Sequence, residues 1–104
     1  MMAAALLLLF TLPTPTHSAP MTTSWYQAGH TTASGRRFHP DGLTAAHKYL
    51  PFGTRLHLRY KGKRVKVVVN DRGPFVKGRH LDISRGAARV LALNGVGVVD
   101  AVVD

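Results

Sequence analysis

Carboxyl groups are the scarcest reactive side chains in this sequence, and their scarcity limits the chemistry available to the chain. Every acidic residue among the 104 is an aspartate, and together they are Asp41, Asp71, Asp82, Asp100 and Asp104. The chain has no cysteine, which excludes a disulfide, a thiolate zinc site and a cysteine nucleophile. An acid catalyst must therefore be one of these five aspartates.

Two of the aspartates stand where a strand would present them to a site. Asp71 follows the valine-rich residues 65–69, where a strand meets its loop. Asp82 lies in Leu-Asp-Ile, so in a strand its side chain points away from those of its apolar neighbours. Structural roles are the alternatives. Asn-Asp-Arg-Gly-Pro is also a favourable turn, and Asp82 is placed to pair with Arg79 or Arg85 or to cap a helix.

Histidine is the other candidate ligand or proton carrier. His30, His39, His47 and His80 show no His-x-x-x-His spacing, and no glutamate accompanies them, so we expect no metal site. The sequence has no Gly-x-Gly-x-x-Gly or phosphate-loop pattern and no Gly-x-Ser-x-Gly elbow, so we expect no cofactor.

The elements that must position these residues are predicted to be short strands. Residues 22–27 have the β-branched and aromatic content of a first strand, and residues 28–42 are typical of a loop. Residues 54–60 alternate strictly, with Leu56, Leu58 and Tyr60 on one face. A turn at 61–63 leads to residues 65–69, whose near-continuous valine predicts burial on both faces.

The C-terminal third is predicted to add one short helix between two strands. Residues 81–83 are strand-like, and Ser84 is placed to cap a helix over 85–93 that ends at Asn94-Gly95. Its apolar stripe would hold Ala87, Ala88, Leu91 and Val90, and residues 96–103 would form the last strand. Short strands, Gly and Pro turns and one helix predict a mainly β fold, a small barrel with a helical insertion.

The N-terminus and the charge balance suggest export and an anionic partner. Residues 1–10 are apolar and residues 11–20 polar and Pro-rich, which predicts a signal peptide over 1–19 and a folded domain over 21–104. A buried N-terminal helix is the alternative. The chain carries 14 Lys+Arg against 5 acids, a formal +9, which attracts nucleic acid, acidic wall polymers or anionic membranes alike. The basic run 55–66 is a solvated face, a wall-polymer contact or a nucleic-acid patch.

Five ordered segments resemble the rare lipoprotein A-like family over about residues 22–103. They are Ser24-Trp25-Tyr26, then Thr32-Ala33-Ser34-Gly35 with Phe38, then Leu43-Thr44-Ala45-Ala46-His47 running into Leu50-Pro51-Phe52-Gly53-Thr54, then Asn70-Asp71-Arg72-Gly73-Pro74-Phe75, and Gly78-Arg79-His80-Leu81-Asp82-Ile83-Ser84. The resemblance implies a six-stranded double-psi β-barrel with an open groove for glycan strands. It also implies a lytic transglycosylase that cleaves between N-acetylmuramic acid and N-acetylglucosamine and leaves a 1,6-anhydro end.

The resemblance also implies roles for individual residues. Asp71 or Asp82 would be the general acid, and His47 would relay a proton or bind substrate, with a satisfied, partly buried histidine as its alternative. Sugar hydroxyls or N-acetyl groups would be bound by Tyr26, Thr44 and Arg72. Trp25 and Tyr26 are otherwise core aromatics. One acid suffices for this reaction, because the sugar's own C6 hydroxyl replaces water as the nucleophile, whereas a hydrolase usually needs two carboxylates.

Two departures from the family pattern motivate a second hypothesis. Arg36 and His39 stand where members often have Glu and Asp, which favours a non-catalytic, expansin-like glycan-binding module. A general acid also needs a raised pKa, while Arg72 and Arg79 adjoin the candidates and lower it. We expect burial, or the closeness of Asp71 to Asp82, to offset them.

The partners and location expected from the sequence follow from these hypotheses. The partners are peptidoglycan glycan strands, with acidic wall polymers as a further class, and no specific nucleic acid. The expected location is the periplasm or the extracellular cell wall. Lipidation needs a cysteine, so we expect neither a lipoprotein nor a stable membrane anchor, and we expect a monomer.

Overall fold

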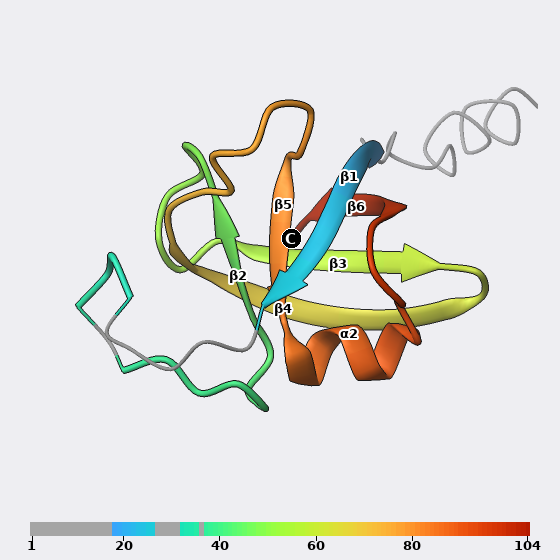
Figure 1. Ribbon diagram of the computed structural model, residues 1–104, viewed down its shortest axis with the longest axis horizontal. Helices are drawn as coiled ribbons and strands as arrows, with labels where there is room; N and C mark the ends of the chain where they lie inside the picture. Colours follow the sequence, from blue (N-terminus) through green and yellow to red (C-terminus); the bar gives the residue numbers. More distant parts are fainter. Residues whose placement is uncertain (1–17, 27–31, 36) are drawn as a thin grey trace, which may run out of the picture.

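The strands of this protein close into a barrel. The computed structural model describes residues 18–26, 32–35 and 37–104. Within them the chain runs through β1 (Ser18–Tyr26), β2 (Thr44–His47), β3 (Arg55–Tyr60), β4 (Lys63–Asp71), β5 (Leu81–Ser84), α2 (Arg85–Leu91) and β6 (Gly97–Val103). The barrel order is β1-β5-β2-β4-β3-β6, as Figure 1 shows. The β1–β5 and β2–β4 pairs are parallel and the other pairs antiparallel. The predicted mainly β barrel with one short helix is confirmed.

The core lies inside the barrel and is built from alternate residues. Leu56 and Leu58 of β3 are fully buried, as the alternation predicts, while their neighbours face solvent. On β4, Val65, Val67 and Val69 are buried, but Val68 is 37% exposed. The prediction that this segment is buried on both faces is therefore wrong, because a small closed barrel fills its interior and leaves its outer face to solvent here.

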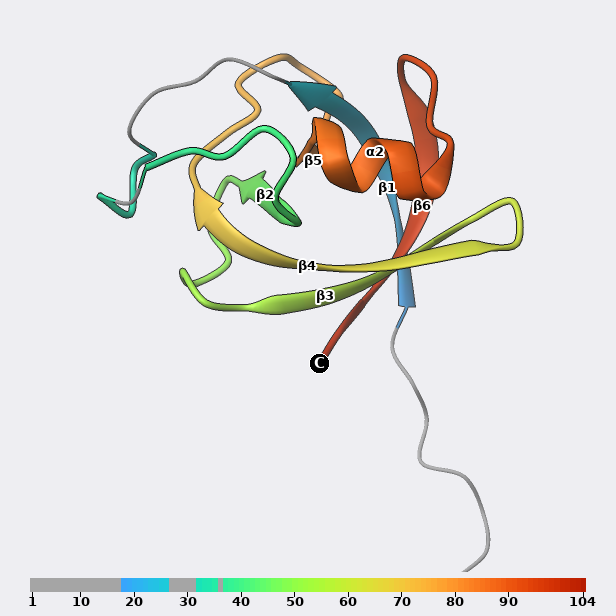
Figure 2. The same cartoon turned by 90° about the horizontal axis from the view of Figure 1, so that it is seen from below.

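Helix α2 packs against β4, β5 and β1 and covers one side of the barrel (Figure 2). Ala87, Ala88 and Leu91 are buried as predicted, but Val90 is exposed and lies outside the apolar stripe. The helix ends at Leu91, two residues before the predicted end. Ala92 takes the left-handed conformation, with φ 54°, and its backbone N–H bonds to Ala88 O and Arg89 O. The sequence indicated Gly95 as the stop, since an alanine rarely occupies this cap position.

The strand β2 was not predicted. Its four residues, Thr-Ala-Ala-His, have little intrinsic strand preference, yet they pair with β4 on one side and β5 on the other. Pairing and burial between two neighbours thus override local propensity. The first strand also begins earlier than expected, at Ser18, which pairs with Val102 of β6.

A single hydroxyl joins α2 to the loop that leads into β2. Ser84 Oγ accepts hydrogen bonds from the N–H of Ala87, as the helix N-cap, and from the N–H of Thr44, each at 3.3 Å, and donates to Gly42 O. The side chain is fully buried. It therefore fixes the start of the helix and the entry to β2 together.

We predict that Ser84→Ala lowers the free energy of unfolding by about 1–2 kcal/mol, the usual cost of an N-cap, because Ala87 N and Gly42 O lose this partner. Urea unfolding followed by circular dichroism measures the change. The matched control is Lys77→Ala in the exposed 72–80 loop, which we expect to stay within about 0.5 kcal/mol of the parent. An equal, small effect for both variants would contradict the role assigned to Ser84.

Candidate functional site

The two candidate aspartates lie in one row across four neighbouring strands. Ser24 of β1 pairs with Asp82 of β5, Asp82 pairs with Ala46 of β2, and Ala46 pairs with Asp71 of β4. Residues directly opposite each other on paired strands project from the same face of the sheet. Two strand spacings separate the aspartates, about 9–10 Å between their Cα atoms. The structure therefore places both carboxyl groups on one wall, on either side of Ala46.

A register shift in β4 turns Asp71 toward this wall. Ala45 pairs with Val69, but the next residue of β2, Ala46, pairs with Asp71, so Asn70 is an extra residue on β4. Val69 is fully buried in the core, and regular alternation would point Asp71 in the same direction. The inserted residue reverses the orientation, as a β-bulge does.

Asp82 is held in an environment that favours its protonated form. Burial raises the pKa of Asp82, and the nearby charge of Asp71 adds a smaller rise. The hydrogen bond from Ser24 Oγ to Asp82 Oδ1, at 2.9 Å, and the charge of Arg79 act in the opposite direction but do not cancel the effect of burial. The expected offset is thus confirmed for Asp82, with burial as the main cause.

Asp71 is held by backbone amides. Its Oδ1 accepts hydrogen bonds from Ala33 N at 2.8 Å and from Arg72 N at 2.9 Å. Donors of this kind stabilise a carboxylate. The turn-type bonds considered from the sequence are present, and they fix the carboxyl group at the end of β4 without removing it from the row.

Unpartnered polar atoms gather beside the two carboxyl groups. The buried side-chain oxygens without a hydrogen-bond partner among the described residues are Tyr26 Oη, Thr44 Oγ1 and Asn70 Oδ1. Burial raises the pKa of Tyr26, and the charges of Asp71 and Asp82 raise it further. The nearby Thr44 hydroxyl lowers the pKa of Tyr26 and so opposes this rise. The geometry between Tyr26 Oη and Thr44 Oγ1 is nevertheless not that of a hydrogen bond. Orphaned groups at one place point to a ligand that completes their bonding.

A groove of about 880 Å³ opens at Thr44 and Asn70, next to the row that holds Asp71 and Asp82, although neither carboxyl group nor Tyr26 is among the residues that line it. Thr44 and Asn70 line it, together with the ring of Phe52 and the side chains of Arg37 and His39. Its size is in the range of ligand-binding clefts. His39, one of the two family departures, thus faces the groove with a basic side chain. Arg36, the other, lies outside the described residues, as does His30.

Tyr26 stacks inside the structure. Its ring lies 4.8 Å from that of Phe38, with 25° between the planes, so one face of Tyr26 is covered by protein. Trp25 is partly buried against the core, as the core-aromatic alternative suggested. The Tyr26 hydroxyl, rather than its ring, is the part placed near the carboxyl groups.

Arg72 acts on the neighbouring loop in this structure. Its Nη1 donates to Leu50 O at 2.8 Å and to His47 O at 3.2 Å, and its guanidinium lies 4.0 Å from the centroid of the Phe52 ring. These contacts hold the β2–β3 loop, and with it Phe52, in place at the groove. A direct contact between Arg72 and a sugar stays a prediction.

His47 is not brought into the same groove. It lies one residue beyond Ala46 on β2, so its side chain takes the opposite face, where it is buried. Its Nδ1 accepts hydrogen bonds from Tyr49 N at 3.2 Å and Leu50 N at 3.1 Å, which leaves the proton of the neutral ring on Nε2. Burial lowers the pKa of His47, and the charges of Arg72, His80 and Lys48 lower it further. The satisfied histidine described as the alternative is what the structure shows, and the proton-relay role stays a prediction.

The other candidate acid near the groove is engaged elsewhere. Asp41 accepts two hydrogen bonds from Arg85, at 3.0 and 2.9 Å, and lies 3.5 Å from Arg89. This interaction with Arg85 lowers the pKa of Asp41. Asp41 therefore clamps its loop to α2. No group of three or more His and Asp side chains in the described part of the chain could hold a metal ion.

Sequence reasoning missed Ser24 and Asn70 as site residues. The sequence presents Ser24 only as part of a motif, because its bond to Asp82 depends on the β1–β5 register. Asn70 has the residue type of a turn that ends a strand. The one local signal was that a polar residue, rather than a valine, followed the alternating valines of β4.

The fold and the site together define a closed six-stranded barrel with two carboxyl groups in one row beside a groove. The barrel resembles that of Streptomyces papain inhibitor, with a TM-score of 0.69 and 19% identity over 88% of this chain and 98% of that one, which concerns the fold alone. Residues 18–103 match the family model described as lytic transglycolase, and the chain belongs to this family.

Several longer proteins that are similar in sequence share one printed name. The chain is 55% identical over 73 residues to the "Probable endolytic peptidoglycan transglycosylase RlpA" of Nostoc sp., 68% of this chain and 20% of that protein. It is 48% identical to the protein of that name from Synechocystis sp., over 78% of this chain and 27% of that protein. It is 46% identical to the "Endolytic peptidoglycan transglycosylase RlpA" of Rickettsia prowazekii, over 72% of this chain and 26% of that protein. The chain thus spans about a quarter of the length of these relatives.

We predict that Asp82→Asn leaves stability unchanged at low pH and raises it at pH 7. A carboxyl with a raised folded-state pKa has no destabilising effect below its unfolded pKa, near 3.8, and weakens the fold as the pH rises through the higher folded value. The asparagine keeps an acceptor for Ser24 but carries no charge. Urea unfolding at pH 3 to 7 measures the difference.

The control for this experiment is Asp100→Asn, because Asp100 is an exposed carboxyl of β6. We expect its unfolding free energy to stay within about 0.5 kcal/mol of the parent throughout the range. An Asp82→Asn variant that is less stable than the parent at pH 7 would show that the charged form of Asp82 is the favoured one.

Proposed function

We propose that this chain is an endolytic peptidoglycan lytic transglycosylase that cleaves between N-acetylmuramic acid and N-acetylglucosamine and leaves a 1,6-anhydro end. The observation that carries the proposal is that Asp82 and Asp71 lie in one row, on either side of Ala46 and next to the groove. The pKa of Asp82 is raised, and Asp71 is held by two backbone amides. The family and the printed names of the relatives support the same reaction class.

In this mechanism Asp82 is the general acid and Asp71 stays ionised. Protonated Asp82 gives its proton to the glycosidic oxygen as the C1–O bond breaks, and the carboxylate of Asp71 stabilises the positive charge that develops on the sugar. The C6 hydroxyl of the same sugar then attacks C1, and its proton passes to the Asp82 carboxylate. Water is not consumed, and the acid is regenerated.

The remaining groups of the groove bind the glycan. The Tyr26 hydroxyl, Thr44 Oγ1 and Asn70 Oδ1 have no hydrogen-bond partner in residues 18–26, 32–35 and 37–104, and they would bond to sugar hydroxyls or N-acetyl groups. Phe52, fixed by Arg72, offers an aromatic face to a sugar ring. His47 holds the β2–β3 loop through Nδ1, and its Nε2–H remains as a donor for a proton relay or a substrate contact.

We predict that Asp82→Asn lowers the release of 1,6-anhydro products from purified glycan strands by about 10²–10⁴-fold, because a general acid contributes this much. Asp71→Asn should lower it by about 10²-fold, since it removes an electrostatic contribution. Mass spectrometry of the soluble products measures both. Asp100 lies on β6, which is not a neighbour of β4 or β5 in the barrel, so Asp100→Asn should keep the parent rate.

Two outcomes would reject this assignment in different ways. Full activity of both the Asp71 and Asp82 variants would remove these residues from the mechanism. Tight binding of glycan strands by the parent without any 1,6-anhydro product would favour the non-catalytic module instead, for which His39 in the groove is the motivating observation.

We also propose that the chain is exported to the periplasm or the outer cell wall as a monomer, with residues 1–19 as its signal peptide. The support is the apolar run followed by a polar, Pro-rich segment. Cleavage after Ala19 would remove the first two residues of β1, which pair with Val102 and Ala101, and would leave the rest of the strand. No helix among the described residues is long and apolar enough to cross a bilayer.

We expect residues 1–20, fused to a reporter enzyme that is active only after export, to give reporter activity outside the cytoplasm. The matched control is the same fusion with Leu7→Arg and Leu8→Arg, which interrupts the apolar run and should keep the reporter inside. Equal activity of the two fusions, or none from either, would reject the signal peptide.

A further inference from the structure

The outer face of the β3–β4 hairpin carries cations that the proposed reaction does not use. Arg59 of β3 lies opposite Arg64 of β4, and His57 lies opposite Lys66. Residues in such positions project from the same face, about 5 Å apart at Cβ, where like charges destabilise a sheet. We call these four residues the cationic face. An arrangement that works against folding is expected where the residues serve another purpose.

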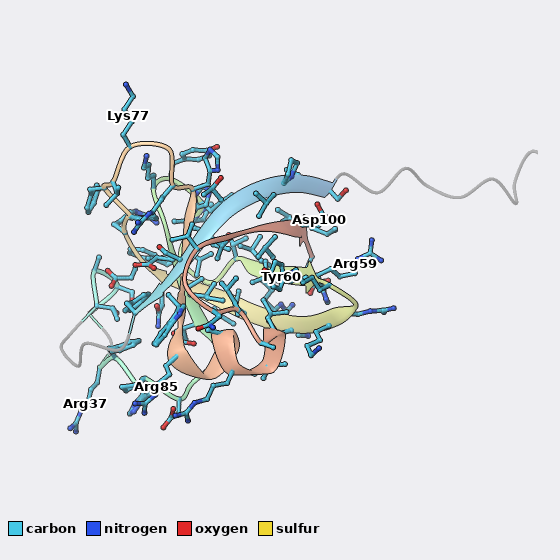
Figure 3. All side chains as sticks on the ribbon, turned by 45° about the vertical axis from the view of Figure 1, so that its right-hand side comes forward. Arg37, Arg59, Tyr60, Lys77, Arg85 and Asp100 are labelled. Atoms are coloured by element: carbon cyan, nitrogen blue, oxygen red, sulfur yellow. The ribbon has the colours of Figure 1, made fainter. Side chains whose placement is uncertain are left out.

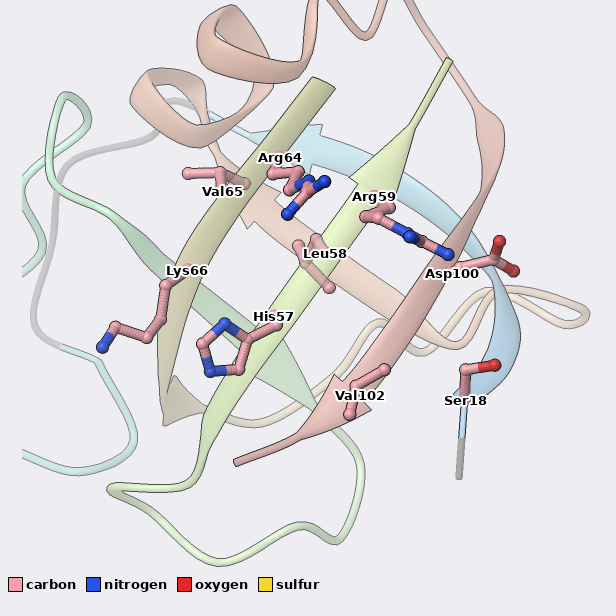
Figure 4. A pocket seen from close by; sticks show the side chains of 9 residues that line it. All are labelled: Ser18, His57, Leu58, Arg59, Arg64, Val65, Lys66, Asp100 and Val102. Atoms are coloured by element: carbon pink, nitrogen blue, oxygen red, sulfur yellow. The ribbon is translucent and has the colours of Figure 1, made fainter. Parts of the chain in front are cut away.

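The cationic face lines a cavity of about 450 Å³, separate from the glycan groove. Figure 4 shows Arg64 extending from β4 toward β3 and Arg59 extending from β3 toward Asp100, its partner on β6, with His57 and Lys66 further along. Leu58 and Val65, whose side chains belong to the core, also line this cavity. In Figure 3, Arg59 and Asp100 lie at the opposite end of the molecule from Arg37 of the groove.

Acidic neighbours neutralise only part of the surrounding charge. Asp104 forms an ion pair with Arg55 at 3.3 Å, and its other carboxyl oxygen lies 3.2 Å from His57 Nε2. Within the described ranges no carboxylate lies within 4 Å of a side-chain nitrogen of Arg59, Arg64 or Lys66. The cavity lining thus has three permanent cations against the one carboxylate of Asp100.

The chemistry of these side chains fits phosphate oxygens better than nucleobases. Arg59 and Arg64 line the same cavity, and each guanidinium group offers the planar fork that binds phosphate in a bidentate manner. Binding to single-stranded nucleic acid normally adds aromatic side chains on which bases stack. The exposed aromatic residues of the described chain are Tyr49, Phe52 and Phe75, and all lie on the β2–β3 and β4–β5 loops. The cationic face would therefore detect charge and spacing but no base.

The outer face of β4 leads from this cavity to the glycan groove. Arg64 and Lys66 line the first, and Val68 and Asn70 line the second, so the alternate residues of one strand join them. At about 3.3 Å per residue, Arg64 and Asn70 are separated by roughly 20 Å. A chain attached to the glycan could reach both sites at once.

We propose that the cationic face binds a linear polymer of phosphate groups that carries no nucleobases, and that it holds the protein on glycan strands to which such polymers are attached. The binding site itself stands on the geometry of the β3–β4 hairpin. Only the naming of the polymer as a cell-wall component rests on the proposed function.

The test uses labelled polyphosphate of defined length and the full chain. One variant combines Arg59→Gln, Arg64→Gln and Lys66→Gln, and its matched control combines Lys48→Gln, Lys61→Gln and Lys77→Gln, three exposed cations outside the cavity. Fluorescence anisotropy at 50 and 200 mM salt gives the Kd of each. We expect the first variant to bind at least tenfold more weakly at 50 mM salt, with a salt slope lower by about 2, and the control to change less than about threefold.

Three further measurements make the outcome decisive. Equal weakening of both variants would mean that diffuse charge, not the cationic face, binds the polymer, and would overturn the proposal. More than tenfold tighter binding of single-stranded DNA with the same number of phosphates would overturn it in favour of a nucleic-acid surface. The unfolding midpoint of the first variant at low salt should be unchanged or raised, because like charges have been removed, whereas a lowered midpoint would assign these residues to folding.

The two proposals fail separately. Release of 1,6-anhydro products from phosphate-free glycan should be the same for the parent and the cationic-face variant. A parent that binds polyphosphate without any lytic activity would reject the proposed function and leave the binding site standing.

Discussion

The extra residue in β4 is the feature on which the candidate site depends. Val67 and Val69 face the core, and a regular strand would place Asp71 beside them. A carboxylate buried there without a cation costs several kcal/mol, so such a barrel would be unstable. The insertion of Asn70 between the residues that pair with Ala45 and Ala46 turns Asp71 outward and into register with Asp82. The same insertion leaves Asn70 Oδ1 without a partner at the groove.

The two aspartates then differ because of their immediate surroundings rather than their position. Both pair with Ala46 from opposite sides, yet Asp71 receives two backbone amide hydrogen bonds while Asp82 receives one from a hydroxyl. Burial dominates at Asp82 and raises its pKa. A carboxyl group with a raised pKa is what acid-catalysed glycosidic cleavage needs. The cost of holding Asp82 in this environment is paid in folding stability, as is common at active sites.

The sequence predicts those parts of this structure that depend on local patterns. Alternation located β3 and the inward valines of β4, and the Ser84 cap located the start of α2. Periodicity could not locate β2, because its four residues become a strand only between two partners. Nor could it reveal the bulge, which depends on the register between strands distant in sequence. For the same reason His47 was grouped with Asp71 and Asp82, although the one-residue step from Ala46 places it on the other face.

The strand β4 joins all of these features, because a period of two lets one strand serve two surfaces. Its inward valines hold the core, and its outward residues run from Arg64 and Lys66 to the groove and end at Asp71. The register with β3 that packs those valines also sets Arg64 against Arg59 and Lys66 against His57. Packing and repulsion therefore cannot be adjusted independently along this hairpin. Added salt screens the repulsion and so favours the fold, while it weakens any anion bound to the same cations, so the two roles of β4 respond to ionic strength with opposite sign.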